Sequence, residues 1–361
     1  AYQFLKFRID AHQNGTLTDL VVERKGMGTD QDFGKGYVYV NGVRVTNGKS
    51  MTSADDRYTF NNLNIQLTAG QSVEVAVLAD IPSSANAGNV NYLQVVSASA
   101  GSVDTSQLVG MRGPSVSLSG SVVGSISVSS STSGISNPTL GETNVLLAKI
   151  QITNNDTQTV QLEQLLLEQK GTIGANAVQN FVFKDSANNT VATASGVQTA
   201  GTAKLVVLNF NPVVSLPAGS SKVFTLYGDI TSNAQVNDTV YYQIKEASDI
   251  KAKRTDFNVY VSLSSTTPPP ITSQTLHIQG GQVTFVNKYT PVARSVSKGQ
   301  NNVSLLDFDV IAQQIVEFQK LRVKVEGKDG WWSDDGNNSD ADGLINNPSN
   351  TPNLLSIRIV D

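Results

Sequence analysis

The chain has 361 residues, with 26 Lys and Arg against 30 Asp and Glu, so its formal net charge is −4 and only 16% of its residues are charged. It has no Cys and two His, which excludes a disulfide framework, a thiolate zinc site, an iron–sulfur cluster and a Cys nucleophile. The acidic balance without a long Lys/Arg run argues against nucleic-acid binding, and no apolar stretch reaches the ~18–20 residues of a membrane span. Few charges and no Cys favour an extracellular β-protein of a bacterial or archaeal cell surface.

The first predicted strand covers residues 4–10, where Leu5, Phe7 and Ile9 alternate with charged residues. A period of two predicts a strand with one buried face and one solvated face. Similar segments recur at 147–153 and 305–311. Each is followed by a second strand-like segment, at 17–22, 162–167 and 318–323, and each of these ends near a glycine.

The clearest internal repeat pairs residues 68–81 with residues 217–230. Each segment predicts a turn at its Ala-Gly pair and then a strand, and each ends with the residues Asp-Ile. Gly70 and Gly219 are expected to supply the positive φ of the turn. Two further elements support a period of about 150–158 residues; they lie at 37–41, 181–185 and 357–361, and at 124–128 and 281–285.

Short strands at regular spacing, separated by Gly, Asn, Asp and Ser, predict an all-β chain of tandem immunoglobulin-like antiparallel β-sandwich domains. The expected core of the middle copy comprises alternating apolar residues: Ile150, Ile152, Leu162, Leu165, Leu167, Phe181, Phe183, Val206, Leu208, Val214, Leu216, Phe224, Leu226, Ile230, Val240, Tyr242 and Ile244.

Three domains are predicted. Residues 1–113 form a repeat that lacks its opening strands, residues 114–267 form a complete repeat, and residues 268–361 form a truncated repeat with an acidic loop at 328–350. The Pro-rich segment 264–270 is expected to be a stiff, extended linker. Because the outer repeats are incomplete and the first residue is Ala1, the chain is expected to be a window on a longer surface protein.

The segments 147–153, 162–167 and 216–230 resemble those of long bacterial surface proteins built of immunoglobulin-like repeats. These include S-layer and cell-wall proteins, particularly those of the small-celled candidate-phyla bacteria. The resemblance covers nearly the whole chain as a pattern rather than as a motif. It implies a structural or adhesive role, a large parent protein and, in many cases, bound calcium.

A calcium loop is predicted around Asn338, Asp340 and Asp342, which are followed by Gly343. Oxygen ligands at alternate positions wrap a hard cation, and the glycine permits the sharp turn. This is not an EF-hand, because Ser349 stands where that loop has Glu. Asp334, Asp335 or a backbone carbonyl would close the site. The alternative is an acidic surface loop that binds nothing. A weaker acidic echo occurs in the first repeat at Asp30 and Asp32.

Trp331 and Trp332 could stack on a sugar ring, although such a pair also serves as the lid of a core or as part of an interface. His12 and His277 lie in different repeats, and no nucleophile elbow or phosphate-binding loop accompanies them. No catalytic set is therefore predicted.

The sequence predicts a non-enzymatic, structural cell-surface protein of a prokaryote, similar to an S-layer protein and stabilised by calcium. Its expected partners are further copies of itself in a lattice, and a cell-wall or surface glycan. Two alternatives stay open at this point: an adhesin or carbohydrate-binding protein, and an extracellular filament subunit that exchanges strands.

Overall fold

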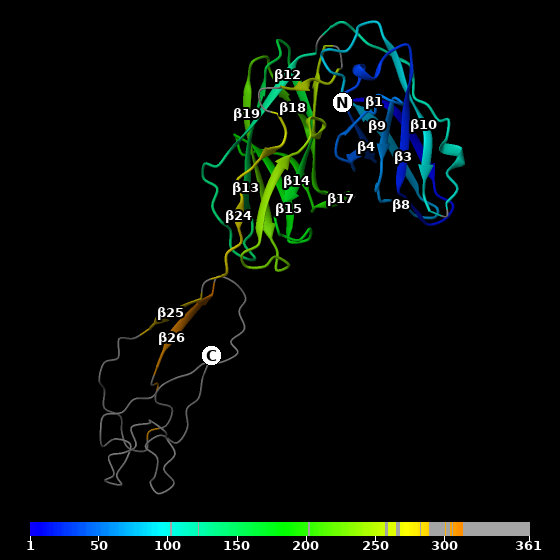
Figure 1. Cartoon of the computed structure of the whole chain (residues 1–361). Coiled ribbons are helices and arrows are strands. Elements are labelled where there is room, and N and C mark those ends of the chain that lie inside the picture. Colours follow the sequence, from blue (N-terminus) through cyan, green and yellow to red (C-terminus); the bar gives the residue numbers. More distant parts are fainter. Residues whose placement is uncertain are drawn as a thin grey trace. The chain divides into compact units, whose positions relative to one another are not determined.

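A computed structural model describes residues 1–312, apart from 102, 122, 201–202, 257–258, 265–267, 282, 289–299, 301–303 and 305. The chain divides into two compact units, Ala1–Val283 and Thr284–Asp361. The described residues are all-β apart from short 3-10 turns, and the first unit holds two antiparallel β-sandwiches (Figure 1). Within this described part, no helix is long and apolar enough to cross a membrane.

The first sandwich has two main sheets, whose apolar faces pack together in one core. One sheet has the order β1 (Tyr2–Asp10), β9 (Ser72–Ala79), β4 (Lys35–Val40) and β5 (Val43–Arg44), with β6 (Lys49–Ser50) also on β4. The other has the order β11 (Val116–Ser117), β10 (Val90–Ser99), β3 (Asp19–Gly26) and β7 (Arg57–Phe60). A small ribbon pairs β2 (Gly15–Leu17) with β8 (Ile65–Leu67), and the 3-10 turns are η1 (Asp30–Asp32) and η2 (Ser106–Leu108).

The second sandwich repeats this plan with longer strands. One sheet has the order β16 (Thr190–Ala194), β15 (Val178–Asp185), β19 (Ser221–Ile230), β13 (Val145–Asn154), β12 (Ser125–Ser131) and β22 (Ser262–Leu263). The other has the order β17 (Gln198–Ala200), β18 (Ala203–Leu216), β14 (Val160–Lys170), β20 (Thr239–Ile244) and β23 (Ile271–Thr272). In addition, β21 (Ile250–Arg254) pairs with β14, β24 (Leu276–His277) pairs with β20, and η3 covers Ala247–Asp249.

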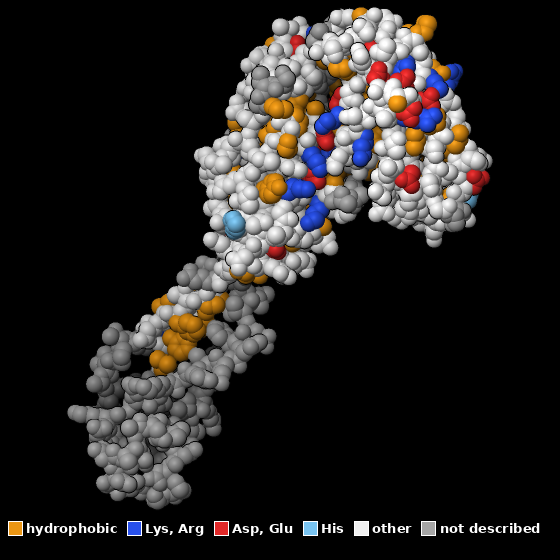
Figure 2. Space-filling model, in the orientation of Figure 1, with side chains coloured by type: hydrophobic (Ala, Val, Ile, Leu, Met, Phe, Trp, Pro, Cys, Tyr) orange, Lys and Arg blue, Asp and Glu red, His pale blue; other side chains and the backbone are white. Residues whose placement is uncertain are grey.

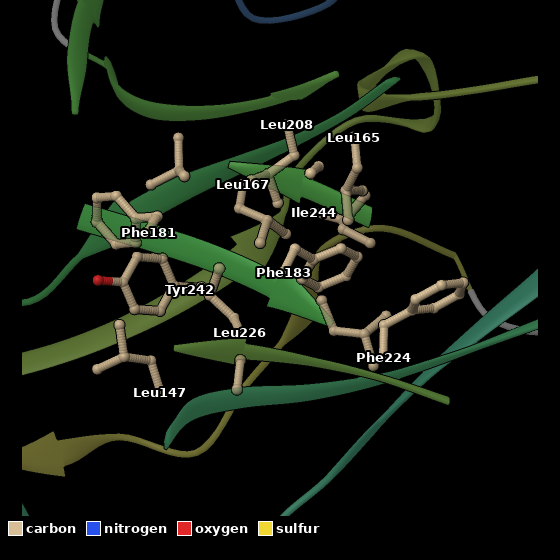
Figure 3. Close-up of a cluster of buried hydrophobic side chains, with 14 of the residues drawn as sticks. Leu147, Leu165, Leu167, Phe181, Phe183, Leu208, Phe224, Leu226, Tyr242 and Ile244 are labelled. Carbon is tan, nitrogen blue, oxygen red and sulfur yellow. The ribbon is translucent and has the colours of Figure 1, made fainter. Parts of the chain in front are cut away.

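The core of the second sandwich confirms the sequence prediction, because every residue predicted for it is buried. Phe183 lies at its centre, stacked against Phe224 with a centroid distance of 5.3 Å and edge-on to Phe210 at 6.0 Å. Figure 3 shows Phe183 and Phe224 side by side among leucines from both sheets. The alternation of apolar residues in the sequence therefore corresponds to the inward faces of the strands.

The internal repeat is also confirmed by strand register. Phe7 lies opposite Val75 in the first sandwich, and Ile150 lies opposite Phe224 in the second. Each pairing has a bulge near its start, between Gln3 and Leu5 in the first copy and between Leu146 and Ala148 in the second. The two copies therefore share a distortion of the ladder as well as a strand order.

The domain ends differ from those predicted. The first sandwich extends past residue 113, since β11 pairs with β10 and the Gly88 N–H donates to the Leu118 carbonyl at 2.9 Å. The second likewise extends past residue 267, since β24 pairs with β20 and the Asn237 N–H donates to the Ile278 carbonyl at 2.8 Å. Leu276 and Ile278 are buried because they complete the apolar core of the second sandwich.

The Pro-rich segment does not separate two domains as predicted. Before it, the Ser264 N–H donates to the Ile126 carbonyl at 2.7 Å. After it, Ile271 and Thr272 pair with β20. Both flanks therefore belong to the second sandwich, and the prolines lie in a connection within that domain.

In the remaining part of the chain, the described residues form a two-stranded sheet of β25 (Val283–Asn287) and β26 (Phe308–Ala312). These strands overlap the predicted segments 281–285 and 305–311, and the third domain itself stays a prediction. Its acidic loop at 328–350 lies outside the described residues.

Candidate functional site

The two sandwiches of the first unit meet at a junction formed by β4, β5 and the residues after them on one side, and by η3 with the adjoining ends of β20 and β21 on the other. Figure 2 shows a column of basic and acidic side chains where the two sandwiches meet. The contacts in this junction link residues about 200 positions apart in the sequence. It is the most developed polar site in the described part of the chain.

A buried ion pair lies at the centre of the junction. Arg44 on β5 is 1% exposed and Asp249 at the end of η3 is fully buried. The Arg44 Nε donates to Asp249 Oδ1 at 2.6 Å, and Nη2 donates to Asp249 Oδ2 at 3.0 Å. The remaining guanidinium nitrogen, Nη1, donates to the Thr46 carbonyl. This two-pronged geometry fixes the orientation of both side chains as well as their separation.

Asp249 is held from its own side as well. Its Oδ2 accepts hydrogen bonds from the backbone N–H groups of Lys245 and Glu246, at 3.1 and 2.9 Å. Burial raises the pKa of the Asp249 carboxyl, and Arg44 and these hydrogen bonds oppose that rise. The same pairing raises the pKa of Arg44 against the effect of its burial. The ion pair therefore depends on both partners being present.

Four further hydrogen bonds surround the ion pair. The Tyr39 hydroxyl donates to the Ser248 carbonyl at 3.0 Å, and burial raises the pKa of Tyr39, which keeps it a donor. Glu246 accepts from the Gly48 N–H at 3.1 Å and from the Lys35 ammonium at 3.4 Å. The Lys251 ammonium donates to the Gly42 carbonyl at 3.4 Å and lies 5.3 Å from the centre of the Tyr39 ring.

An apolar cluster completes the junction. Leu166, Leu205 and Val207 are buried side chains of β14 and β18, and they face outward from the core of the second sandwich. Val43 and Val45 of the first sandwich pack against them, together with Ala203. Apolar burial and the ion pair therefore act together to hold the two sandwiches in a fixed relation.

A second buried carboxylate, Asp32, stands inside the first sandwich at the end of η1. It accepts four hydrogen bonds: from the backbone N–H groups of Thr29 and Asn86, at 3.0 and 3.1 Å, and from the side-chain amides of Asn89 and Asn91, at 2.8 and 2.9 Å. Burial acts to raise the pKa of Asp32, but these donors outweigh it and hold the pKa below its usual value.

Asp30 and Asp32 were the weaker calcium candidates of the sequence. Asp30 is half-buried in the same turn, whereas the carboxylate of Asp32 is directed at N–H donors. Among the described residues, no group of three or more His, Asp and Glu side chains is placed to hold a metal. The principal candidates, Asn338, Asp340, Asp342, Asp334 and Asp335, lie outside the described residues, as do Trp331 and Trp332, so calcium and sugar binding there stay predictions.

Sequence reasoning missed Arg44 and Asp249 as a site. One local signal was available, because Glu246 and Asp249 have the spacing of a capping box, and Thr29 with Asp32 has the same spacing. That pattern identifies carboxylates that bind backbone N–H groups at the start of a helical turn. It would have found the turns, but it gives no indication that Arg44 reaches one of them.

No family model and no curated protein matches this chain. Among solved structures, it is similar to the C-terminal domain of the Streptococcus pyogenes antigen I/II-family protein AspA, with 11% identity, 71% of this chain and 84% of that chain covered, and a TM-score of 0.18. The C-terminal domain of the Streptococcus agalactiae antigen I/II polypeptide BspA gives 7% identity, 71% and 83% coverage, and a TM-score of 0.17.

A β-glucuronidase from Bacteroides uniformis is also similar, at 9% identity and a TM-score of 0.17. The match covers 78% of this chain but only 26% of the enzyme. With TM-scores this low, none of these matches assigns a function to the chain.

Proposed function

We propose that the chain is a non-enzymatic, structural repeat protein of a prokaryotic cell surface, similar to an S-layer protein, in which extracellular sandwiches associate into a lattice. The observation that carries the proposal is the junction around Arg44 and Asp249. A protein whose task is mechanical needs neighbouring domains that keep a fixed angle. A buried, two-pronged ion pair beside an apolar cluster supplies that constraint, whereas a flexible linker would not.

Calcium belongs to this proposal as a stabiliser of the third repeat. Asn338, Asp340 and Asp342 would provide oxygen ligands, and Asp334 or Asp335 would close the loop. The second repeat has no carboxylate at the corresponding loop, residues 172–176. Calcium would therefore be an addition to one repeat rather than a requirement of the fold.

Immunogold labelling of the source cells, followed by electron microscopy of the purified protein, tests the proposal. We expect label on the outer surface and ordered sheets when the protein is concentrated. Label confined to the cell interior would refute the surface role. Surface label with scattered single particles would instead support the adhesin alternative at Trp331 and Trp332, which a glycan array would then examine.

The edge of β1 is the place where the filament alternative, in which a strand is exchanged between subunits, can be examined. In the second sandwich, β13 pairs with β19 on one edge and with β12 on the other. Its counterpart β1 pairs with β9 alone among the described residues. Ile152 on β13 is fully buried, whereas the equivalent Ile9 on β1 is only partly buried. An added strand on β1 would cover Ile9.

Fusing a copy of residues 124–144 ahead of Ala1 tests the filament alternative, because these residues contain β12 and its connection to β13. If β1 accepts such a strand, the amides of β1 gain protection from hydrogen exchange and filament assembly stops. The control carries Asp at the positions of Ile126 and Val128 in the fused copy. Equal exchange in both fusions would rule out strand addition at this edge.

A further inference from the structure

A groove of about 730 Å³ lies between the two sandwiches of the first unit, beside the apolar cluster of the junction. The first sandwich contributes residues from its β4–β5 turn and from the region of β8, including Ile65 and Gln66. The second contributes Gln164 from β14, Gln198 and Thr199 from β17, and Asn209 from β18. The proposed structural function makes no use of this groove.

The chemistry of the groove selects an uncharged ligand. None of the lining residues in the described part of the chain carries a charge, and most present an amide, a hydroxyl or an aliphatic side chain. A charged ligand would lose its hydration there without gaining a counter-charge. No aromatic side chain lines the groove either, so it lacks the flat surface on which sugar rings and bases stack.

Amide side chains suit a polypeptide backbone instead. The carboxamide of Gln or Asn resembles a peptide unit, because it has N–H donors on its nitrogen and a carbonyl oxygen that accepts. Aliphatic side chains between the amides, such as the partly exposed Val40 and Val43, offer contacts for the side chains of an extended segment. Alternating polar and apolar contacts are what a strand presents along its length.

Two strands at the groove are at the ends of their sheets. Among the described residues, β17 pairs only with β18, and β8 pairs only with β2. Both contribute lining residues: Gln198 and Thr199 from β17, and Ile65 and Gln66 from β8. Edge strands of this kind present backbone N–H and C=O groups with which an added strand can pair.

A buried acceptor provides independent support. Gln164 is 9% exposed, and its Nε2 donates to Asn209 Oδ1 at 2.8 Å. Its Oε1 is buried and has no hydrogen-bond partner. Buried polar atoms in folded proteins are nearly always paired, so this orphan acceptor has an incentive to turn toward the adjacent groove, where a ligand N–H would satisfy it.

We propose that the groove binds an extended, uncharged polypeptide segment of alternating small polar and aliphatic residues, with Gln164 and Asn209 contacting its backbone. Such a ligand would touch both sandwiches at once, and it would therefore stabilise their fixed relation. This site is additional to the structural role and does not depend on lattice formation.

The test uses the whole chain labelled with ¹⁵N and a short, capped peptide of alternating Ser and Val. We expect the side-chain amide signals of Gln164, Gln198 and Asn209 to shift on titration. A peptide of the same length that alternates Ser and Lys, and the neutral sugars chitotriose and maltotriose, serve as comparison ligands. Shifts caused by the sugars alone, or no shifts with any ligand, would overturn the proposal.

Variants locate the site. Thr199→Arg places a large cation in the groove and should weaken binding of the Ser–Val peptide by roughly tenfold or more. The matched control is Thr193→Arg, also at an exposed threonine near an edge of the second sandwich but outside the groove. Gln164→Leu should weaken binding without loss of fold, since a leucine needs no partner there. Equal affinity in all three variants would show that the peptide binds elsewhere.

Discussion

Replacing Arg44 by Met removes one partner of the buried ion pair while keeping an unbranched side chain of similar length. The perturbation breaks two hydrogen bonds to Asp249, at 2.6 and 3.0 Å, and leaves a fully buried carboxylate without its counter-ion. Removing one partner of a buried pair costs about 3–5 kcal/mol. Asp249 keeps its bonds to the N–H groups of Lys245 and Glu246, so we expect the lower half of that range, about 3–4 kcal/mol.

Two comparison variants separate the ion pair from general effects of the substitution. In Arg44→Met with Asp249→Asn, no charge is stranded and the Asn oxygen can still accept from the backbone, so we expect a cost of only about 1–2 kcal/mol. Arg8 lies on the same sheet, is 69% exposed and pairs with an exposed Asp10. Arg8→Met should cost less than about 1 kcal/mol, because exposed pairs are weak.

The pH dependence gives the Arg44→Met variant a signature. Burial already raises the pKa of Asp249, and without Arg44 nothing but two N–H groups opposes that rise. When the pKa of a carboxyl group is higher in the folded state than in the unfolded state, where it is near 3.9, its charge destabilises the fold. This destabilisation is complete at pH values above the folded-state pKa. As the pH falls through that pKa toward 3.9, the carboxyl becomes neutral and the deficit disappears.

Urea unfolding followed by far-UV circular dichroism measures the overall loss, and hydrogen exchange read by mass spectrometry locates it. Peptides that cover the β4–β5 turn and η3 should exchange faster in Arg44→Met than in the wild type, while the core of β19 should be less affected. A loss no larger than that of Arg8→Met, or a deficit that stays constant between about pH 4 and 8, would refute the reasoning.

Three more predictions follow from other parts of the chain. Phe183→Ala should cost about 3–5 kcal/mol in urea unfolding, against less than about 0.5 kcal/mol for Val223→Ala, which removes a 38%-exposed side chain from the same sheet; equal losses would contradict the central place of Phe183. Asp32→Asn should cost about 2–4 kcal/mol at pH 7, because an amide N–H₂ would face N–H donors. Folding lowers the pKa of Asp32, so its contribution to the free energy of unfolding is present above about pH 4 and fades as the pH falls through the folded-state pKa. The melting temperatures of wild type and Asp32→Asn should therefore converge in acid. Melting temperatures that stay equally far apart at every pH would contradict this role of Asp32. Chelation with EDTA should lower the calorimetric melting of the third repeat if its acidic loop binds calcium, and superimposable profiles would end that hypothesis.

The fold was predictable because its signal is local and repeated. Alternating residues such as Leu5, Phe7 and Ile9 mark one face of a strand, and a second copy of each pattern confirms the assignment. Domain ends were less predictable, since Leu276 lies in a two-residue strand and Ile278 just after it, and so short a segment carries little pattern of its own. Pro and Gly mark turns, and a turn inside a domain looks the same in a sequence as a linker between domains.

The junction could not be predicted, because its two halves have no counterparts within the repeat. Arg44 lies opposite Tyr39, which pairs with Ala76 on β9. In the second copy the residue equivalent to Ala76 pairs with Lys184, and Thr190 lies opposite Lys184 in the place of Arg44. Asp249 is the last residue of η3, which stands between β20 and β21, whereas β10 in the first copy runs along β3 with only a register shift between Val95 and Ser97 at that point. A comparison of the two copies therefore finds the core residues, which the copies share. It does not find the junction residues, because these differ between the copies.

That difference bears on how an array of such repeats would be built. The junction joins two different faces: the β4–β5 side of the first sandwich contacts the η3 side of the second. Contacts between two different faces can repeat from one copy to the next along a chain. Here they cannot continue with the same ion pair, because Thr190 stands at the β15–β16 turn in the place that Arg44 has in the first sandwich. The ion pair is thus specific to these two sandwiches. We infer that they act as a rigid pair.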